Sequence, residues 1–215
     1  MADNSVPLPI FALGTVLFPG GLLPLRVFEA RYMDMIRNAM RGSGEFGVCL
    51  IRKGQEVAER GVETAEIGCR ARIDDWSMEQ LGVLQIATTG TERFRIVARR
   101  LQPDGLLVAD VEPIDEEHVV AVSSEAAPCQ VLLRRIVERL EGDREGKDAS
   151  KTDDDEALPL LIAKPYLFDD STWVGNRLCE LLPIPVSAKQ KLMALTDGPT
   201  RLDIVLRYLK QHGIV

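Results

Sequence analysis

Apolar and polar residues alternate along the first half of the chain, which is the pattern of strands with one buried face. The alternating or continuously apolar runs lie at residues 8–13, 15–18, 22–27, 46–50, 67–73, 84–86, 94–96 and 107–111. We place a turn at residues 88–92, between the runs at 84–86 and 94–96. Several short strands joined mainly by tight turns predict an antiparallel sheet curled into a small barrel.

One helix is predicted within this β-rich half, over residues 28–41. Tyr32, Met35, Ile36 and Ala39 follow the i, i+3, i+4, i+7 spacing of one helical face. Phe28 is expected on the same inner face, four residues before Tyr32. Glu29 and Arg31 beside this face are expected to form ion pairs, and Arg93 is one candidate partner for Glu29.

After about residue 120 the period of the apolar positions becomes helical. Helices are predicted after a cap at Ser123 or Ser124, over 158–166, over 170–182, after a capping box of Ser187 with Gln190, and around 202–209. The predicted fold class is therefore α+β. A β-rich barrel of PUA-like type over residues 1–118 precedes an α-helical bundle over 119–215, with a flexible acidic connection near 142–156.

The charge distribution argues against a general affinity for nucleic acid. The formal net charge is −7, and eight acids but only three bases lie between residues 141 and 156. The rest of the chain is close to neutral and has no extended basic stripe for a phosphate backbone. Nucleic acid is therefore not an expected partner.

The uncharged stretch at residues 4–25 is long enough to raise the question of a signal peptide or a membrane span. Prolines at 7, 9, 19 and 24 and glycines at 14, 20 and 21 would break a spanning helix, and Asp3 stands where a signal carries positive charge. We interpret the stretch as two buried strands around a turn. No membrane is expected as a partner.

The cysteine and histidine positions predict neither disulfides nor a metal site. Cys49, Cys69, Cys129 and Cys179 are far apart and include no C-x-x-C pair. Buried free thiols are the simplest interpretation, and they suit a reducing cytoplasm. Only His118 and His212 could assist the cysteines, which is too few ligands for a recognisable zinc site.

No motif for catalysis stands out. The nearest approach to a phosphate loop is residues 142–148, where Asp148 replaces the required hydroxyl and the glycine spacing is one residue short. Neither histidine has a nucleophile motif nearby, and Asp74 and Asp75 are expected as solvated turn residues. The chain is predicted to be no enzyme and to use no cofactor.

Residues 8–32 read LPIFALGTVLFPGGLLPLRVFEARY. A strand ending in Leu-Phe-Pro-Gly, a second strand with Pro-Leu, and Phe-Glu-x-Arg-Tyr at a helix start resemble the N-terminal substrate-binding domain of the Lon protease family. Residues 46–48, 66–73 and 90–96 resemble the family's later strands. The resemblance implies a PUA-like barrel followed by helices. It also implies a non-enzymatic module that binds hydrophobic or unfolded peptide segments, with an adaptor or scaffold role for a protease or chaperone as one form of that activity.

Two apolar clusters are candidates for peptide binding. Trp76, Met78 and Leu81 gather at a predicted turn between strands, and Trp173 and Phe168 gather in the helical half beside Tyr166 and Leu167. Buried core is the simpler explanation of each cluster, and an exposed binding patch is the alternative.

Two further functions remain open from the residues alone. Arg70 and Arg72 share the outward side of one predicted strand, as do Arg93 and Arg95 on another, with Phe94 pointing inward. These arginines could serve a PUA-like nucleic-acid binder. A small-molecule pocket in the barrel half is the third possibility. The sequence does not predict which oligomeric state the protein adopts.

Overall fold

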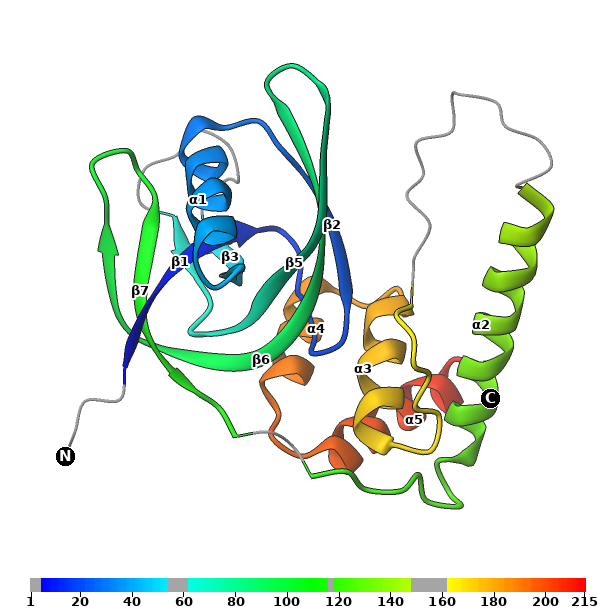
Figure 1. Ribbon diagram of the computed structural model, residues 1–215. Helices are drawn as coiled ribbons and strands as arrows, with labels where there is room; N and C mark the ends of the chain where they lie inside the picture. Colours follow the sequence, from blue (N-terminus) through cyan, green and yellow to red (C-terminus); the bar gives the residue numbers. More distant parts are fainter. Residues whose placement is uncertain (1–4, 54–61, 116–117, 148–161) are drawn as a thin grey trace. The chain divides into compact units, whose positions relative to one another are not determined.

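The computed structural model describes residues 5–53, 62–115, 118–147 and 162–215 (Figure 1). The chain divides into two units: residues 1–116 with 184–194 form the first, and residues 117–183 with 195–215 form the second. Each unit is described separately.

The first unit is built on one sheet. Its strands are β1 (Val6–Leu13), β2 (Leu22–Val27), β3 (Glu45–Lys53), β4 (Glu63–Thr64), β5 (Ile67–Gln80), β6 (Val83–Leu101) and β7 (Leu107–Pro113). The order is β1-β7-β6-β5-β3-β4, with β2 paired to β6. Because β1 also pairs with β3, the pairings β1-β7-β6-β5-β3 return to their starting strand. The predicted α+β class is confirmed, and among the described pairings β1–β3 is parallel whereas the rest are antiparallel.

The predicted turn at residues 88–92 is wrong, because β6 runs through it as one strand of 19 residues. Gly90 is needed there for a close approach: a Cβ at this position would lie 2.3 Å from the carbonyl oxygen of Phe18. The turn lies earlier, at Leu81 and Gly82, and Gly82 has a φ of +83°. The predicted strand at residues 15–18 is absent, since these residues have no strand assignment.

Helix α1 (Ala30–Arg41) has the inner face that the sequence predicts, with Tyr32, Met35, Ile36 and Ala39 buried. Tyr32 stacks on Phe11, with the ring centroids 4.0 Å apart. Phe28 is exposed, contrary to prediction, because the helix begins only at Ala30. Glu29 pairs with Arg31 at 2.9 Å.

Phe94 is fully buried, as its strand parity predicts. It packs in a core cluster with Leu8, Ile10, Cys49, Ile96, Ala109 and Val111. Glycines at 47 and 68 let the ring fit, since a Cβ there would lie 2.8 and 2.5 Å from its Cζ. A second cluster joins α1 to the inner side chains of β1, β2, β3, β5 and β6.

Arg93 is buried, which corrects the expectation of an outward, exposed side chain. It is 4% exposed, and its Nη1 donates to the carbonyl oxygen of Met193 at 3.2 Å. Since neighbouring residues of a strand face opposite ways, both faces of β6 are covered here. Met193 belongs to helix α4 (Val186–Ala194).

Helix α4 is anchored to the sheet by a second bond. Gln190 Nε2 donates to the carbonyl oxygen of Ile67 at 2.9 Å. The predicted capping box with Ser187 does not form, because the helix begins at Val186 and Ser187 lies inside it. These contacts explain why residues 184–194 group with the first unit, whereas the sequence placed a single boundary near residue 118.

The second unit contains helices α2 (Ala127–Lys147), α3 (Ser171–Leu181) and α5 (Gly198–Gln211). Helix α3 begins where the sequence predicts, and Asp170 caps it by accepting from the backbone N–H of Thr172 at 3.0 Å. The helix predicted over 158–166 is not found at 162–166, where Pro165 disfavours it; residues 158–161 lie outside the described ranges. Helix α2 runs to Lys147, so the expected connection near 142–156 starts as helix. The rest of that connection, residues 148–156, lies outside the described ranges.

All four cysteines are free and buried, as predicted. Within the described ranges, the side chains of His, Cys, Asp and Glu form no group of three that could hold a metal ion. Among the described residues, no helix is both long enough and apolar enough to cross a membrane.

Candidate functional site

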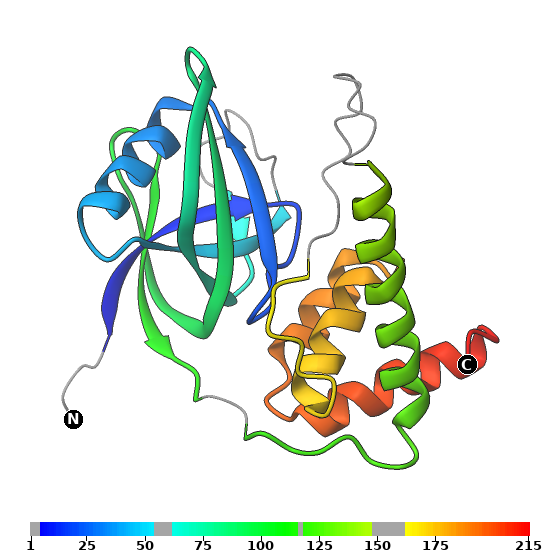
Figure 2. The same cartoon turned by 45° about the vertical axis from the view of Figure 1, so that its right-hand side comes forward.

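The β5–β6 hairpin places three of the candidate residues on one protruding element. We call residues 73–88 the hairpin arm. Its two strands pair from Ile73 opposite Thr88 to Gln80 opposite Val83. Figures 1 and 2 both show its tip reaching beyond helix α1 and strand β2. The arm therefore presents side chains to solvent on an ordered scaffold.

Strand register fixes which side chains of the arm share a face. Leu25 of β2 and Trp76 of β5 both lie opposite Ile86 of β6, and directly opposed residues point to the same side of a sheet. Ile86 is buried in the core cluster with α1, and Leu23, Leu25 and Ile73 pack partly against that cluster. The core face thus continues outward along the arm.

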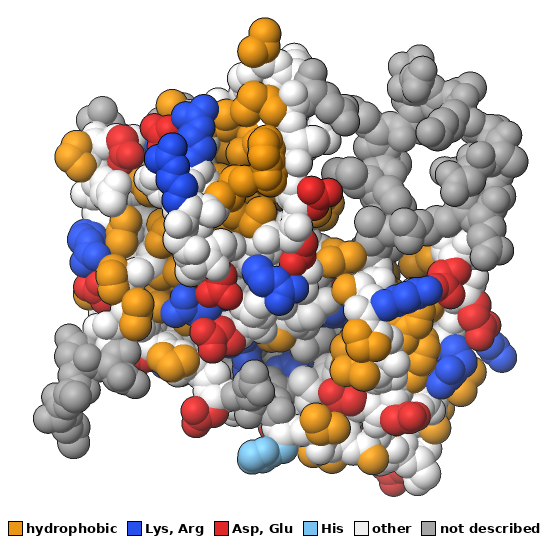
Figure 3. Space-filling model, in the orientation of Figure 1, with side chains coloured by type: hydrophobic (Ala, Val, Ile, Leu, Met, Phe, Trp, Pro, Cys, Tyr) orange, Lys and Arg blue, Asp and Glu red, His pale blue; other side chains and the backbone are white. Residues whose placement is uncertain are grey.

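The outer end of the arm is apolar and exposed. Trp76 is 53% exposed, Met78 43% and Leu81 97%. Figure 3 shows hydrophobic side chains gathered between helix α1 and the hairpin, over β2 and the arm. For these three residues the structure gives exposure, whereas buried core was the simpler sequence interpretation.

The helical cluster differs in its burial. Trp173 is 8% exposed and meets the half-buried Phe168 edge-on at a centroid distance of 5.4 Å. Arg134 lies 4.2 Å above the Phe168 ring, and Gln130 Nε2 donates to the carbonyl oxygen of Phe168. Through these contacts the cluster is part of the packing of the second unit. The hairpin arm belongs to the first unit, so the two candidate clusters lie in different units.

Acidic groups accompany the apolar arm. Asp74 and Asp75 lie on β5 rather than on a turn, which corrects the sequence interpretation. Asp74 accepts from Arg72 Nε at 2.9 Å and from the hydroxyl of Thr89. Asp75 Oδ1 accepts from the backbone N–H of Trp76 at 2.8 Å. Asp74 therefore has a cationic partner, whereas Asp75 accepts from a neutral N–H.

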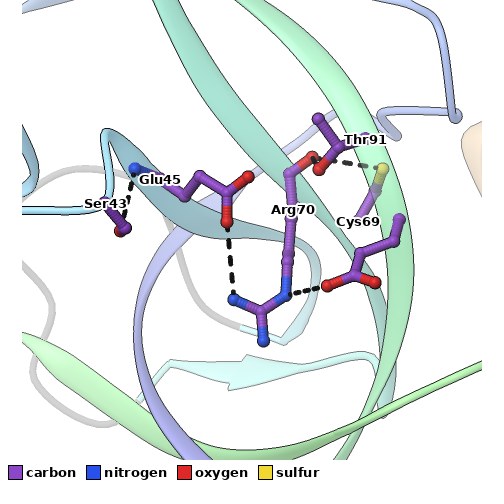
Figure 4. A network of polar contacts seen from close by, with 6 residues as sticks. Ser43, Glu45, Cys69, Arg70 and Thr91 are labelled. Carbon is purple, nitrogen blue, oxygen red and sulfur yellow. Dashed lines mark hydrogen bonds and ion pairs between the residues drawn. The ribbon is translucent and has the colours of Figure 1, made fainter.

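The arginines proposed for nucleic-acid binding are largely engaged within the protein. Figure 4 shows Arg70 between carboxylates, with its Nε 2.8 Å from Glu92 and its Nη1 3.8 Å from Glu45. Thr91 Oγ1 donates to the carbonyl oxygen of Arg70 at 3.5 Å. With Arg72 paired to an acid and Arg93 buried, the four arginines do not form one exposed basic row.

Residues 7–211 match the family model of the ATP-dependent protease La (LON) substrate-binding domain, so the chain belongs to this family. The crystal structure of a Lon N-terminal domain protein from Xanthomonas campestris is similar, with 30% identity, a TM-score of 0.73, and coverage of 94% of this chain and 98% of that one. The N-terminal domain of a Mycobacterium avium complex Lon protease shares the fold, at 17% identity and a TM-score of 0.65, with 96% and 100% covered.

Curated relatives are longer than this chain. A Lon protease from Anaeromyxobacter dehalogenans is 24% identical over 217 residues, which is 97% of this chain and 24% of the relative. The protein cereblon from Gallus gallus is 31% identical over 136 residues, which is 63% of this chain and 30% of cereblon. The chain spans about a quarter of the length of the Lon relatives it matches.

Sequence reasoning missed part of this surface. Leu23, Leu25 and Ile73 were assigned only to strands, because their place beside Trp76 depends on the β2–β6–β5 register. Asp75 was assigned to a turn. One signal was available: residues 73–92 contain four acids and no lysine or arginine, which marks an acidic, apolar segment.

Proposed function

We propose that this chain binds exposed hydrophobic segments of unfolded or flexible polypeptides through the hairpin arm. The observation that carries the proposal is the exposure of Trp76, Met78 and Leu81 on one hairpin whose inner face continues the core. Membership of a substrate-binding domain family supports the same function. In this proposal the chain acts as an adaptor or scaffold that holds such segments for a protease or chaperone.

The size of the exposed surface sets the expected affinity. Covering the exposed half of Trp76 removes roughly 100 Å² from water, which contributes about 2–3 kcal/mol. Met78 and Leu81 add comparable amounts when a peptide covers them. Association and the ordering of the peptide cost several kcal/mol, so we expect a dissociation constant in the micromolar range or weaker. Weak binding suits capture followed by release.

The test uses a short, neutral, fluorescein-labelled peptide in which Leu and Phe alternate with Ser. Fluorescence anisotropy measures its binding to wild type, Trp76→Ala and Leu81→Ser. We expect each variant to weaken binding about tenfold or more, with an unchanged melting temperature because both side chains are exposed. Val97→Ser is the matched control, since Val97 is an exposed residue of β6 outside the arm.

Two outcomes would count against the proposal. Unchanged peptide affinity in both arm variants would remove the arm from binding, as would an equal loss in Val97→Ser. A labelled single-stranded RNA in the same titration tests the rival function. Saturable RNA binding at physiological salt without peptide binding would favour the nucleic-acid alternative.

A further inference from the structure

The charge of the arm narrows the class of segment that it can hold. We infer that the arm prefers segments in which apolar residues alternate with lysine or arginine, and that Asp75 is the residue that sets this preference. The inference rests on the peptide binding proposed above. It starts from the composition of residues 73–92, which carry four acids and no base.

Asp75 is the acid best placed to contact a bound segment. It is exposed, and among the described residues it forms no ion pair, whereas Arg72 balances Asp74 and Arg70 contacts Glu92. Its bond to the backbone N–H of Trp76 holds the carboxylate against the strand. Asp75 lies opposite Ala87 and Trp76 opposite Ile86, so the two side chains belong to opposite faces of the arm. An unbalanced negative charge and an exposed aromatic residue therefore follow each other along one strand, on opposite faces of the arm.

The strand pairings place this carboxylate at an open edge of the sheet. Strand β3 pairs with β5 as far as Arg72, and the N–H of Ile73 still bonds to the carbonyl oxygen of Gly44. Beyond Ile73, this side of β5 has no partner strand within the described ranges. The N–H of Trp76 bonds to the Asp75 carboxylate, which we therefore place on that open side. A segment lying along the edge contacts both side chains.

Lysine and arginine are the side chains that fit this pair. In an extended segment along this edge, successive side chains point to opposite faces, so apolar residues reach the face of Trp76 and the lysine or arginine residues between them reach the carboxylate of Asp75. Glutamate or aspartate at the same place would be repelled. Because the site is solvated, the charge preference should be modest and sensitive to salt.

The experiment compares three labelled peptides that share Leu and Phe residues and differ in the alternating residue, which is Lys, Ser or Glu. At about 50 mM salt we expect the Lys peptide to bind wild type about three- to tenfold more tightly than the Ser peptide, and the Glu peptide to bind more weakly. At about 500 mM salt the three affinities should converge. Asp75→Asn keeps an acceptor for the Trp76 N–H and removes only the charge.

Asp75→Asn should lower the affinity for the Lys peptide about threefold and leave that for the Ser peptide unchanged. Asp75→Lys should reverse the order of the Lys and Glu peptides. Glu63→Gln is the matched control, because Glu63 is an exposed acid on β4 outside the arm. It removes the same charge from the protein and should leave the preference intact.

The outcomes separate this inference from the proposed function. Equal affinity for all three peptides would refute the charge preference while leaving peptide binding in place. A preference that survives Asp75→Asn, or that Glu63→Gln also abolishes, would refute the assignment to Asp75. Failure of every peptide to bind would overturn both the proposed function and the inference that depends on it.

Discussion

Replacing Phe94 tests the core of the first unit most directly. The ring is fully buried and packs in the cluster that includes Leu8, Ile10 and Ile96. Glycines at 47 and 68 flank the ring closely. Because glycine has no side chain, neither residue can fill the cavity that Phe94→Ala leaves. We therefore expect the full cost of a large-to-small substitution, about 3–5 kcal/mol.

That cost is a large part of the stability of an ordinary domain, which is roughly 5–15 kcal/mol. For a protein of this size, each kcal/mol lowers the melting temperature by about 2–4 °C. Chemical and thermal denaturation should show the loss in Phe94→Ala, whereas Arg95→Ala, at the exposed neighbouring position, should change stability by no more than about 0.5 kcal/mol. A loss below about 1 kcal/mol in Phe94→Ala would refute the packing argument.

A second substitution at the same site checks the geometry. In Gly47→Ala the new Cβ would lie 2.8 Å from Phe94 Cζ, 2.6 Å from Ile10 Cδ1 and 2.9 Å from Leu8 Cδ2. Such overpacking costs about 1–3 kcal/mol. Because Phe94→Ala removes one of these obstacles, Gly47→Ala should cost less in that background, with a coupling of about 0.5–3 kcal/mol. Strict additivity would show that the two residues do not press on each other.

Three further predictions concern other parts of the chain. Burial raises the pKa of the Cys49 thiol to about 12 and that of Cys129 to about 11, so Ellman's reagent at pH 8 should label these cysteines only after unfolding; rapid labelling of either one in the folded protein would contradict their burial. Asp170→Ala removes the cap of α3 and should cost about 0.5–2 kcal/mol in denaturation, whereas Asp170→Asn should retain most of it. Hydrogen bonds from Thr200 lower the pKa of Asp197 below its usual value of 3.8. Its contribution to stability is therefore present above that value and lost as the pH falls through the lowered pKa, so the difference in melting temperature between wild type and Asp197→Ala should shrink from pH 7 to pH 3.

Local sequence patterns correctly predicted which side chains are buried where the element's own periodicity decides the buried face. The i, i+3, i+4 spacing identified the buried face of α1, and strand parity placed Phe94 inside. Both inferences need only the period of the element and one buried side. The start of α3 was predicted at Asp170 or Ser171, and the Asp170 side chain caps the helix by accepting from the N–H two residues along the chain.

Long-range contacts explain the predictions that failed. The burial of Arg93 depends on Met193, which lies 100 residues away in sequence, and no local pattern reveals that α4 covers this face of β6. Gly90 resembles a turn residue, yet its role is close contact with the backbone of Phe18. The exposure of Trp76 was equally hidden, because an apolar residue on a strand has the same local pattern whether or not another element covers it.

An exposed apolar hairpin with an open strand edge favours pairing with other copies of the chain, and irregularities in its strands oppose that pairing. Strand β5 has register shifts between Ile73 and Asp75 and between Ser77 and Gln80, and Pro24 lies in the neighbouring edge strand β2. The Asp75 carboxylate occupies a backbone N–H that an added strand would otherwise use. These features disfavour regular sheet extension while leaving the apolar side chains accessible. A flexible segment that supplies its own cation can pair with that carboxylate without needing a regular strand ladder, so one acid can protect the free edge and select the segment that binds it.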